Sequence, residues 1–279
     1  MKNLAVKKPV LFGIVSALIV FIVFTLVNLL LGNSISTPVL RVWMDGALRI
    51  VFGILSVVLL GYIIKSNGFK FVFSTKGFAK GIFACLPVLL ICICYIAILF
   101  DIVKINKDFL PQIPARIFQQ TAVGFFEESL FRGLMITAFL IKFGGTAKGR
   151  INAALITAIL FGLIHLFGFL TSGGDILEYI FPALNAMLLG LAFSAVFIYS
   201  KNLLSAMIVH SLYDYFVVIV MPLVVMNMGT PIQIVSNIAL IIILFAVMPV
   251  FSIILIIKAK PFGNVVDKGL TTTLESTAD

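Results

Sequence analysis

The sequence predicts an all-α membrane protein, a polytopic bundle of about eight transmembrane helices with both termini in the cytoplasm. The chain has 279 residues, of which 62% are hydrophobic and 11% charged, and its mean hydropathy is +1.22. This composition excludes a soluble globular domain. Apolar runs long enough to cross a hydrocarbon core, about 20 residues, recur along the chain. Transmembrane β-strands would instead alternate over about ten residues, a pattern that the sequence lacks.

The predicted spans follow one another through short connections, which favours a compact bundle of neighbouring helices. The length of the first apolar run favours a retained helix over a cleaved signal peptide. Residues 1–262 are predicted to form one membrane domain, and the polar tail 263–279 is predicted to be disordered and cytoplasmic. The predicted spans are Val10–Leu31, Ala47–Ile64, Gly81–Phe100, Ile117–Ile141, Ile151–Phe169, Tyr179–Ser200, Leu203–Val225 and Val235–Ile257.

The net charge of +9 raises the question of a nucleic-acid partner, but the distribution of the 20 Lys and Arg residues favours membrane topology instead. Loops on alternate sides differ strongly in basic residues, and the positive-inside rule places the richer side, with both termini, in the cytoplasm. Anionic lipid headgroups are the expected partners of these charges. The richer side collects Lys2, Lys7, Lys8, Lys65, Lys70, Lys76, Lys80, Lys142, Lys148, Arg150, Lys201, Lys258, Lys260 and Lys268, against Arg41, Arg49, Lys104, Lys107 and Arg116 on the other.

Three charged residues lie inside the fourth predicted span: Glu127, Glu128 and Arg132. A charged side chain near the bilayer centre costs roughly 2.5–3.5 kcal/mol on insertion scales, so their presence needs a compensating function. Glu128 and Arg132 are four residues apart, which places them on one helix face where they can pair. Glu127 is rotated away from that face by one residue. We therefore expect Arg132 to hold Glu128, and Glu127 to point elsewhere as a reactive carboxylate suited to general-base catalysis.

The two histidines of the chain, His165 and His210, also lie in apolar segments. Phe161 shares a helix face with His165, and Asp214 shares one with His210, because each pair is four residues apart. An aspartate in this position can orient the ring and select its tautomer. Three helices thus carry polar groups that either converge in one cavity or make unrelated helix–helix hydrogen bonds.

The order of these motifs resembles a known family. Glu-Glu-x-x-x-Arg, Phe-x-x-x-His, a glycine-containing helix and His-x-x-x-Asp follow one another as in the CAAX protease and bacteriocin-processing family. This family, also called Abi, consists of intramembrane glutamate endopeptidases related to the CAAX prenyl endopeptidase. The stretch from Ala186 through Asn202 to His210 is similar as well, and the resemblance covers about residues 118–214.

The resemblance implies a catalytic role for each matching residue. Glu127 matches the residue that activates a water molecule, helped by His165. Glu128 and Arg132, with Phe161 nearby, match residues that hold the site together or contact the substrate. His210 and the residue at position 214 match groups that stabilise the oxyanion, which is often the largest catalytic contribution. Position 214 departs from the prenyl endopeptidase, which has asparagine there, and an ionised aspartate would repel an oxyanion.

The resemblance further implies a metal-independent mechanism without a cofactor, acting on a hydrophobic or membrane-associated peptide in a bacterial plasma membrane. Three alternatives stay open. Two histidines and a glutamate could bind zinc with an open fourth position, although no His-Glu-x-x-His motif is present. The pocket could serve a non-catalytic bacteriocin-immunity or partner protein. Intramembrane carboxylates and histidines also occur in the proton relays of transporters. The oligomeric state is not predicted.

Overall fold

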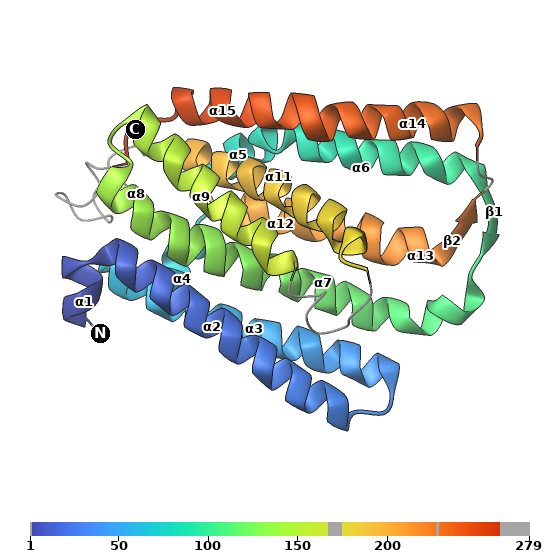
Figure 1. The fold of residues 1–279 in the computed structure, drawn as a ribbon, viewed down its shortest axis with the longest axis horizontal. Helices are drawn as coiled ribbons and strands as arrows, with labels where there is room; N and C mark the ends of the chain where they lie inside the picture. The colour runs from blue at the N-terminus through green and yellow to red at the C-terminus, as the bar shows by residue number, and fades with distance from the viewer. Residues whose placement is uncertain (1, 167–174, 227–228, 263–279) are drawn as a thin grey trace.

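The computed structural model describes residues 2–166, 175–226 and 229–262, which form a bundle of helices lying along one axis (Figure 1). The first elements are α1 (Lys2–Lys7), α2 (Pro9–Ser34), α3 (Pro38–Ile64), α4 (Gly68–Val72), α5 (Phe78–Ala84) and α6 (Leu86–Ile98). There follow η1 (Leu99–Asp101), β1 (Ile102–Ile105), η2 (Lys107–Gln112), α7 (Ile113–Glu128), η3 (Ser129–Ile136), α8 (Thr137–Phe143) and α9 (Ala147–His165). The last are α11 (Leu177–Ser200), α12 (Leu204–Asp214), η4 (Tyr215–Val220), α13 (Met221–Leu223), β2 (Val224–Met226), α14 (Pro231–Ile242), η5 (Ile243–Val247) and α15 (Met248–Lys258).

The predicted all-α membrane bundle is confirmed. Within the described residues, 6 helices are long and apolar enough to cross a membrane, or 7 if the bent pair α5–α6 is one span. The predicted span Ile117–Ile141 is not among these. It corresponds to the helical segment 113–143, which carries the charged residues Glu127, Glu128 and Arg132. The count of about eight and the orientation of the termini stay predictions.

The segment predicted as Gly81–Phe100 is not a straight helix. It bends by 60° between α5 and α6, at Cys85. Pro87, in the first turn of α6, explains the break, because proline has no N–H to donate and its ring clashes with the carbonyl four residues earlier. The two halves therefore meet neighbouring helices at different angles.

A small β-sheet was not predicted. The predicted span Leu203–Val225 ends as a helix at Leu223, and β2 then pairs antiparallel with β1, with Ile102 opposite Met226. Both strands are rich in β-branched residues, which suit extended backbone. The sheet lies at one end of the bundle, where it ties the chain before α7 to the chain after α12 (Figure 1).

The helices are arranged around a central group that carries the predicted site residues. Figure 1 shows α2 and α3 along one side of the bundle, α5–α6 and α14–α15 along the opposite side, and α7–α8, α9, α11 and α12 between them. The buried share is 61% for the most apolar window of α11 but 28% for those of α2 and of α14–α15. The outer helices expose large apolar side chains such as Leu26 and Ile241, as expected for surfaces in contact with lipid.

The start of α1 and the end of α15 lie at the same end of the bundle (Figure 1). An even number of membrane crossings, as the sequence predicts, brings the two ends of a chain to the same side of the membrane. The predicted disordered tail, 263–279, lies outside the described residues, as do the end of the predicted span Ile151–Phe169 and most of the glycine-rich connection that follows it.

Candidate active site

Glu127 and Glu128 occupy the end of α7, where the α-helix passes into the π-helical segment η3. Such turns are rare in helices and often occur at functional sites. The altered backbone pairing leaves the carbonyl oxygen of Arg132 to accept a hydrogen bond from Thr137 Oγ1 at 3.1 Å. Glu128 is fully buried, whereas the side chain of Glu127 is 14% exposed. The two adjacent carboxylates therefore face different surroundings.

Arg132 holds Glu128, as the i,i+4 spacing predicts. Its Nη1 donates to Glu128 Oε1 at 2.9 Å, and its Nη2 donates to the carbonyl oxygen of Gly190 at 3.1 Å. Gly190 lies on α11, and its lack of a side chain makes room for this contact. A Cβ at this position would stand only 3.4 Å from Nη2 and 3.1 Å from the ring of Phe161. The buried ion pair thereby joins the end of α7 to α11.

His210 lies between the three carboxylates of the site. Its Nδ1 is 2.8 Å from Glu128 Oε1, and because a carboxylate can only accept, Nδ1 is the donor. Its Nε2 lies 3.8 Å from Glu127 Oε2 and 3.6 Å from Asp214 Oδ2. Both distances exceed a direct hydrogen bond. Glu128 thus fixes the ring, and Nε2 faces the space between the other two carboxylates.

Aromatic side chains surround this polar group. Phe193 stacks on His210 with ring centroids 5.0 Å apart and an interplanar angle of 16°. Phe161 lies under the Arg132 guanidinium, 4.6 Å from its Cζ, and contacts Phe131 edge to face at 4.9 Å. These rings exclude water from the ion pair and add cation–π attraction for the arginine.

His165 is placed differently from the other predicted residues. It ends α9, where its ring contacts Phe161 at a centroid distance of 4.9 Å. Its Nδ1 lies 2.7 Å from the carbonyl oxygen of Phe161, and because a carbonyl can only accept, Nδ1 carries the proton of this hydrogen bond. Phe161 is also 6.3 Å from His210, so it links both histidines. Among the described residues, however, no hydrogen bond or ion pair joins His165 to Glu127.

Sequence reasoning missed two charged residues and misplaced one of them. Arg49 was counted with the basic loop residues, although the predicted span Ala47–Ile64 contains it. It lies well inside α3, where its Nη1 donates to Glu127 Oε1 at 3.3 Å and its Nε donates to Asp45 Oδ2 at 2.9 Å. The predicted span began at Ala47 and therefore cut Asp45 from its partner. The signal was available, because Asp45 and Arg49 have the same i,i+4 spacing within an apolar run.

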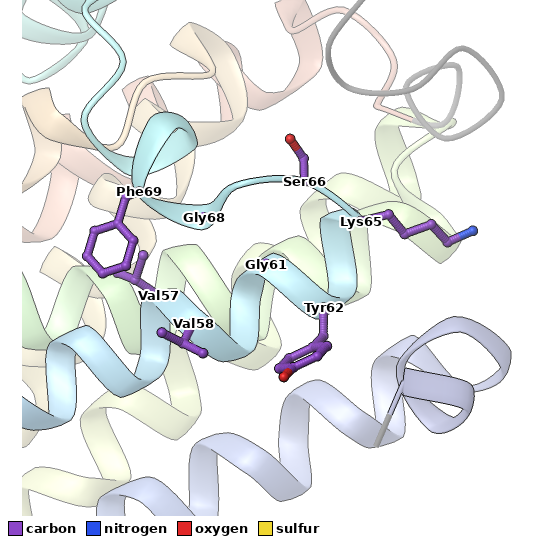
Figure 2. Close-up of a pocket in the computed structure, with 8 residues that line it drawn as sticks. All are labelled: Val57, Val58, Gly61, Tyr62, Lys65, Ser66, Gly68 and Phe69. Carbon is purple, nitrogen blue, oxygen red and sulfur yellow. The ribbon is translucent and has the colours of Figure 1, made fainter.

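Among the described residues, the metal-ligating side chains form no metal site, and one cavity lies away from the predicted site residues. No group of three or more His, Cys, Asp or Glu side chains in the part of the chain that the structure describes is placed so that it could hold a metal ion. A cavity of about 630 Å³ lies at the end of α3 beside α4, with Tyr62 and Phe69 on its wall (Figure 2). Its lining includes none of the predicted site residues.

The fold and the site together define a multi-pass membrane protein with a buried carboxylate, histidine and arginine cluster. Such a cluster holds carboxylates, an imidazole and a guanidinium within a low-dielectric surrounding, where electrostatic interactions are strong.

Comparison with known proteins gives a family match over part of the chain. Residues 109–216 match the family model described as Rce1-like, Type II CAAX prenyl endopeptidase Rce1-like. The matched segment contains all of the predicted site residues. A search of the curated proteins found no match, and a search of the solved structures found none. This Rce1-like match supports membership of the CAAX protease family, as the motifs predicted, and supports a CAAX-protease-like intramembrane endopeptidase in general.

Proposed function

We propose that the protein hydrolyses a peptide bond of a hydrophobic or membrane-associated peptide, with Glu127 as the general base that activates water. The observation that carries this proposal is the position of His210 Nε2 between Glu127 Oε2 at 3.8 Å and Asp214 Oδ2 at 3.6 Å. Glu128 fixes this ring at its other nitrogen, and among the described residues Nε2 has no direct partner within 3.5 Å.

The reaction follows from these positions. Glu127 takes a proton from water as the water oxygen bonds to the scissile carbonyl carbon. The carbonyl oxygen becomes an oxyanion, to which His210 donates from Nε2. Because Nδ1 already donates to Glu128, this requires the imidazolium form, whose charge Glu128 balances. The C–N bond then breaks, and Glu127 returns its proton to the leaving amine. Preorganised donors of this kind are worth about 10²–10³ in kcat each.

His165 and Asp214 have supporting roles in this proposal. His165, whose Nδ1 donates to the carbonyl oxygen of Phe161, acts on Glu127 through the attacking water in this proposal, since no direct contact joins the two among the described residues. Asp214 orients the His210 ring from the side opposite Glu128. It acts in a protonated form or at a distance from the oxyanion, since an ionised carboxylate next to that oxygen would oppose the reaction.

We also propose the partners and the location of the protein. The substrate is a peptide or protein within or at the bilayer, and no metal or cofactor takes part. Both termini lie in the cytoplasm of a bacterial plasma membrane in this proposal, which is supported by the excess of basic residues in the loops on the side of the termini.

The test compares wild type with Glu127→Gln in liposomes, using internally quenched apolar peptides with and without a C-terminal prenylcysteine motif. Glu178→Gln is the matched control, because Glu178 is exposed at the start of α11. We expect cleavage by wild type and the control, no cleavage by Glu127→Gln, and no effect of a zinc chelator. Equal cleavage by wild type and Glu127→Gln would contradict the assignment of the base. Retained immunity in cells carrying Glu127→Gln would favour the non-catalytic alternative.

A further inference from the structure

Arg49 is the cation in direct contact with the carboxylate that we propose as the base. Its Nη1 lies 3.3 Å from Glu127 Oε1, and its guanidinium lies over the ring of Phe24 at 5.0 Å. The side chains of Arg49 and Glu127 are 18% and 14% exposed, so solvent screens this pair only weakly. The contact uses Oε1 and leaves Oε2 facing His210.

Arg49 is itself held in place. Its Nε donates to Asp45 Oδ2 at 2.9 Å. Asp45 is buried and accepts from Asn28 Nδ2 and from Gln119 Nε2, each at 2.7 Å. Residues from α2, α3 and α7 thus form one hydrogen-bonded network that ends at Glu127. Such connected networks restrict the position of every member.

Two glycines allow this network to form. A Cβ at Gly46 would stand 2.7 Å from the ring of Phe118, and one at Gly53 would stand 2.4 Å from the ring of Phe125. Both rings belong to α7, so α3 approaches α7 as closely as glycine permits. Arg49 lies three residues after Gly46 and four before Gly53, on the same helix face, and therefore meets α7 at the crossing.

We propose that Arg49 is a positioning residue for the peptidase, which holds Glu127 by Oε1 so that Oε2 is aimed at the water and at His210. Arg49, Asp45 and Asn28 all lie outside the segment 109–216 that matches the family. The hairpin α2–α3 thus contributes to the chemistry as well as to the fold. This inference rests on the proposed function of Glu127.

The kinetic test compares Arg49→Met, Arg49→Lys and Arg41→Met. Arg41 is the matched control, an exposed arginine on the same helix that donates to a backbone carbonyl. Because misplacement by about 1 Å can cost 10²-fold, we expect kcat of Arg49→Met to fall by roughly 10²-fold with KM changed less than about twofold. Lysine keeps the charge without the forked geometry, so Arg49→Lys should recover about tenfold of that loss. A change in KM alone, or no loss in Arg49→Met, would overturn the proposal.

A second measurement does not depend on turnover. Apolar carbodiimides modify carboxyl groups that they can reach, and the Arg49 guanidinium, 3.3 Å from Oε1, occupies that oxygen of Glu127. Peptide mass spectrometry should show Glu127 labelled faster in Arg49→Met than in wild type, and unchanged in Arg41→Met. Equal labelling in all three proteins refutes the role of Arg49. Faster labelling in a protein that cleaves no peptide keeps that role and rejects the peptidase assignment instead.

Discussion

Removing the arginine of the buried ion pair should strongly destabilise the protein. Glu128 and Arg132 are 0% and 1% exposed, and their side chains meet at 2.9 Å. Breaking a buried pair by removing one partner costs about 3–5 kcal/mol, because the remaining charge is left in a low-dielectric surrounding. The carbonyl of Gly190, which also loses its donor, still accepts from Ser194 Oγ at 2.7 Å, so it adds little. We therefore expect Arg132→Met to lower stability by about 3–5 kcal/mol.

The assay is the apparent Tm in detergent, which should fall by roughly 6–20 °C at 2–4 °C per kcal/mol for a chain of this size. The double variant Glu128→Leu with Arg132→Met removes both charges and should regain about 2 kcal/mol or more, since apolar residues often replace a buried pair without loss. It should remain inactive, because His210 loses its anchor. Arg41→Met, on the exposed face of α3, should change stability by less than about 0.5 kcal/mol. A double variant that melts no higher than Arg132→Met would refute the charge-balance reasoning.

Three further predictions follow from the site and its surroundings. Asp214→Asn should keep or raise peptidase activity, because an amide 3.6 Å from His210 Nε2 cannot carry a charge that opposes the oxyanion and adds a donor. A loss of about 10²-fold or more would show that the carboxylate itself is required. Asn202→Ala should lower stability by about 2–4 kcal/mol in thermal unfolding. The fully buried amide of Asn202 donates to two loop carbonyls at 2.6 and 3.0 Å and accepts from the backbone of α12 at 2.8 Å. A change in stability below about 1 kcal/mol would contradict this prediction. Burial, reinforced by nearby cations, lowers the pKa of Lys201 at the end of α11 to about 7. The unfolded chain therefore binds the proton more tightly between about pH 7 and 10, and wild type should gain stability as the pH rises through this range. Lys201→Met lacks this gain, so its apparent Tm should exceed that of wild type by more at pH 6 than at pH 9. A difference in apparent Tm between the two proteins that does not change with pH would disprove the effect.

The sequence was most informative about contacts between side chains on the same helix. Glu128 and Arg132 pair because four residues bring two side chains onto one face, and this spacing is visible without a structure. His210 and Asp214 face each other for the same reason. Hydropathy likewise placed most helices within a few residues, because a span must satisfy its backbone hydrogen bonds internally and expose apolar side chains to lipid.

The sequence was least informative where separate helices meet. Nothing in the spacing of the chain shows that Arg49 reaches Glu127, since 78 residues separate them. The same holds for Gly190, whose carbonyl accepts from Arg132, and for the pairing of β1 with β2. These contacts depend on which helix faces touch and at what angle, which is set by packing over the whole bundle.

The sequence by itself therefore determined the membrane fold, the family motifs and the division between a buried, paired Glu128 and a separate Glu127. Only the tertiary structure decided what surrounds Glu127: an arginine from α3 on one oxygen and His210 of α12 facing the other. It also showed that, among the described residues, no direct contact joins His165 to Glu127. The physical reason is that helical periodicity fixes neighbours within one turn, whereas the partners of a catalytic group come from helices that only close packing brings together.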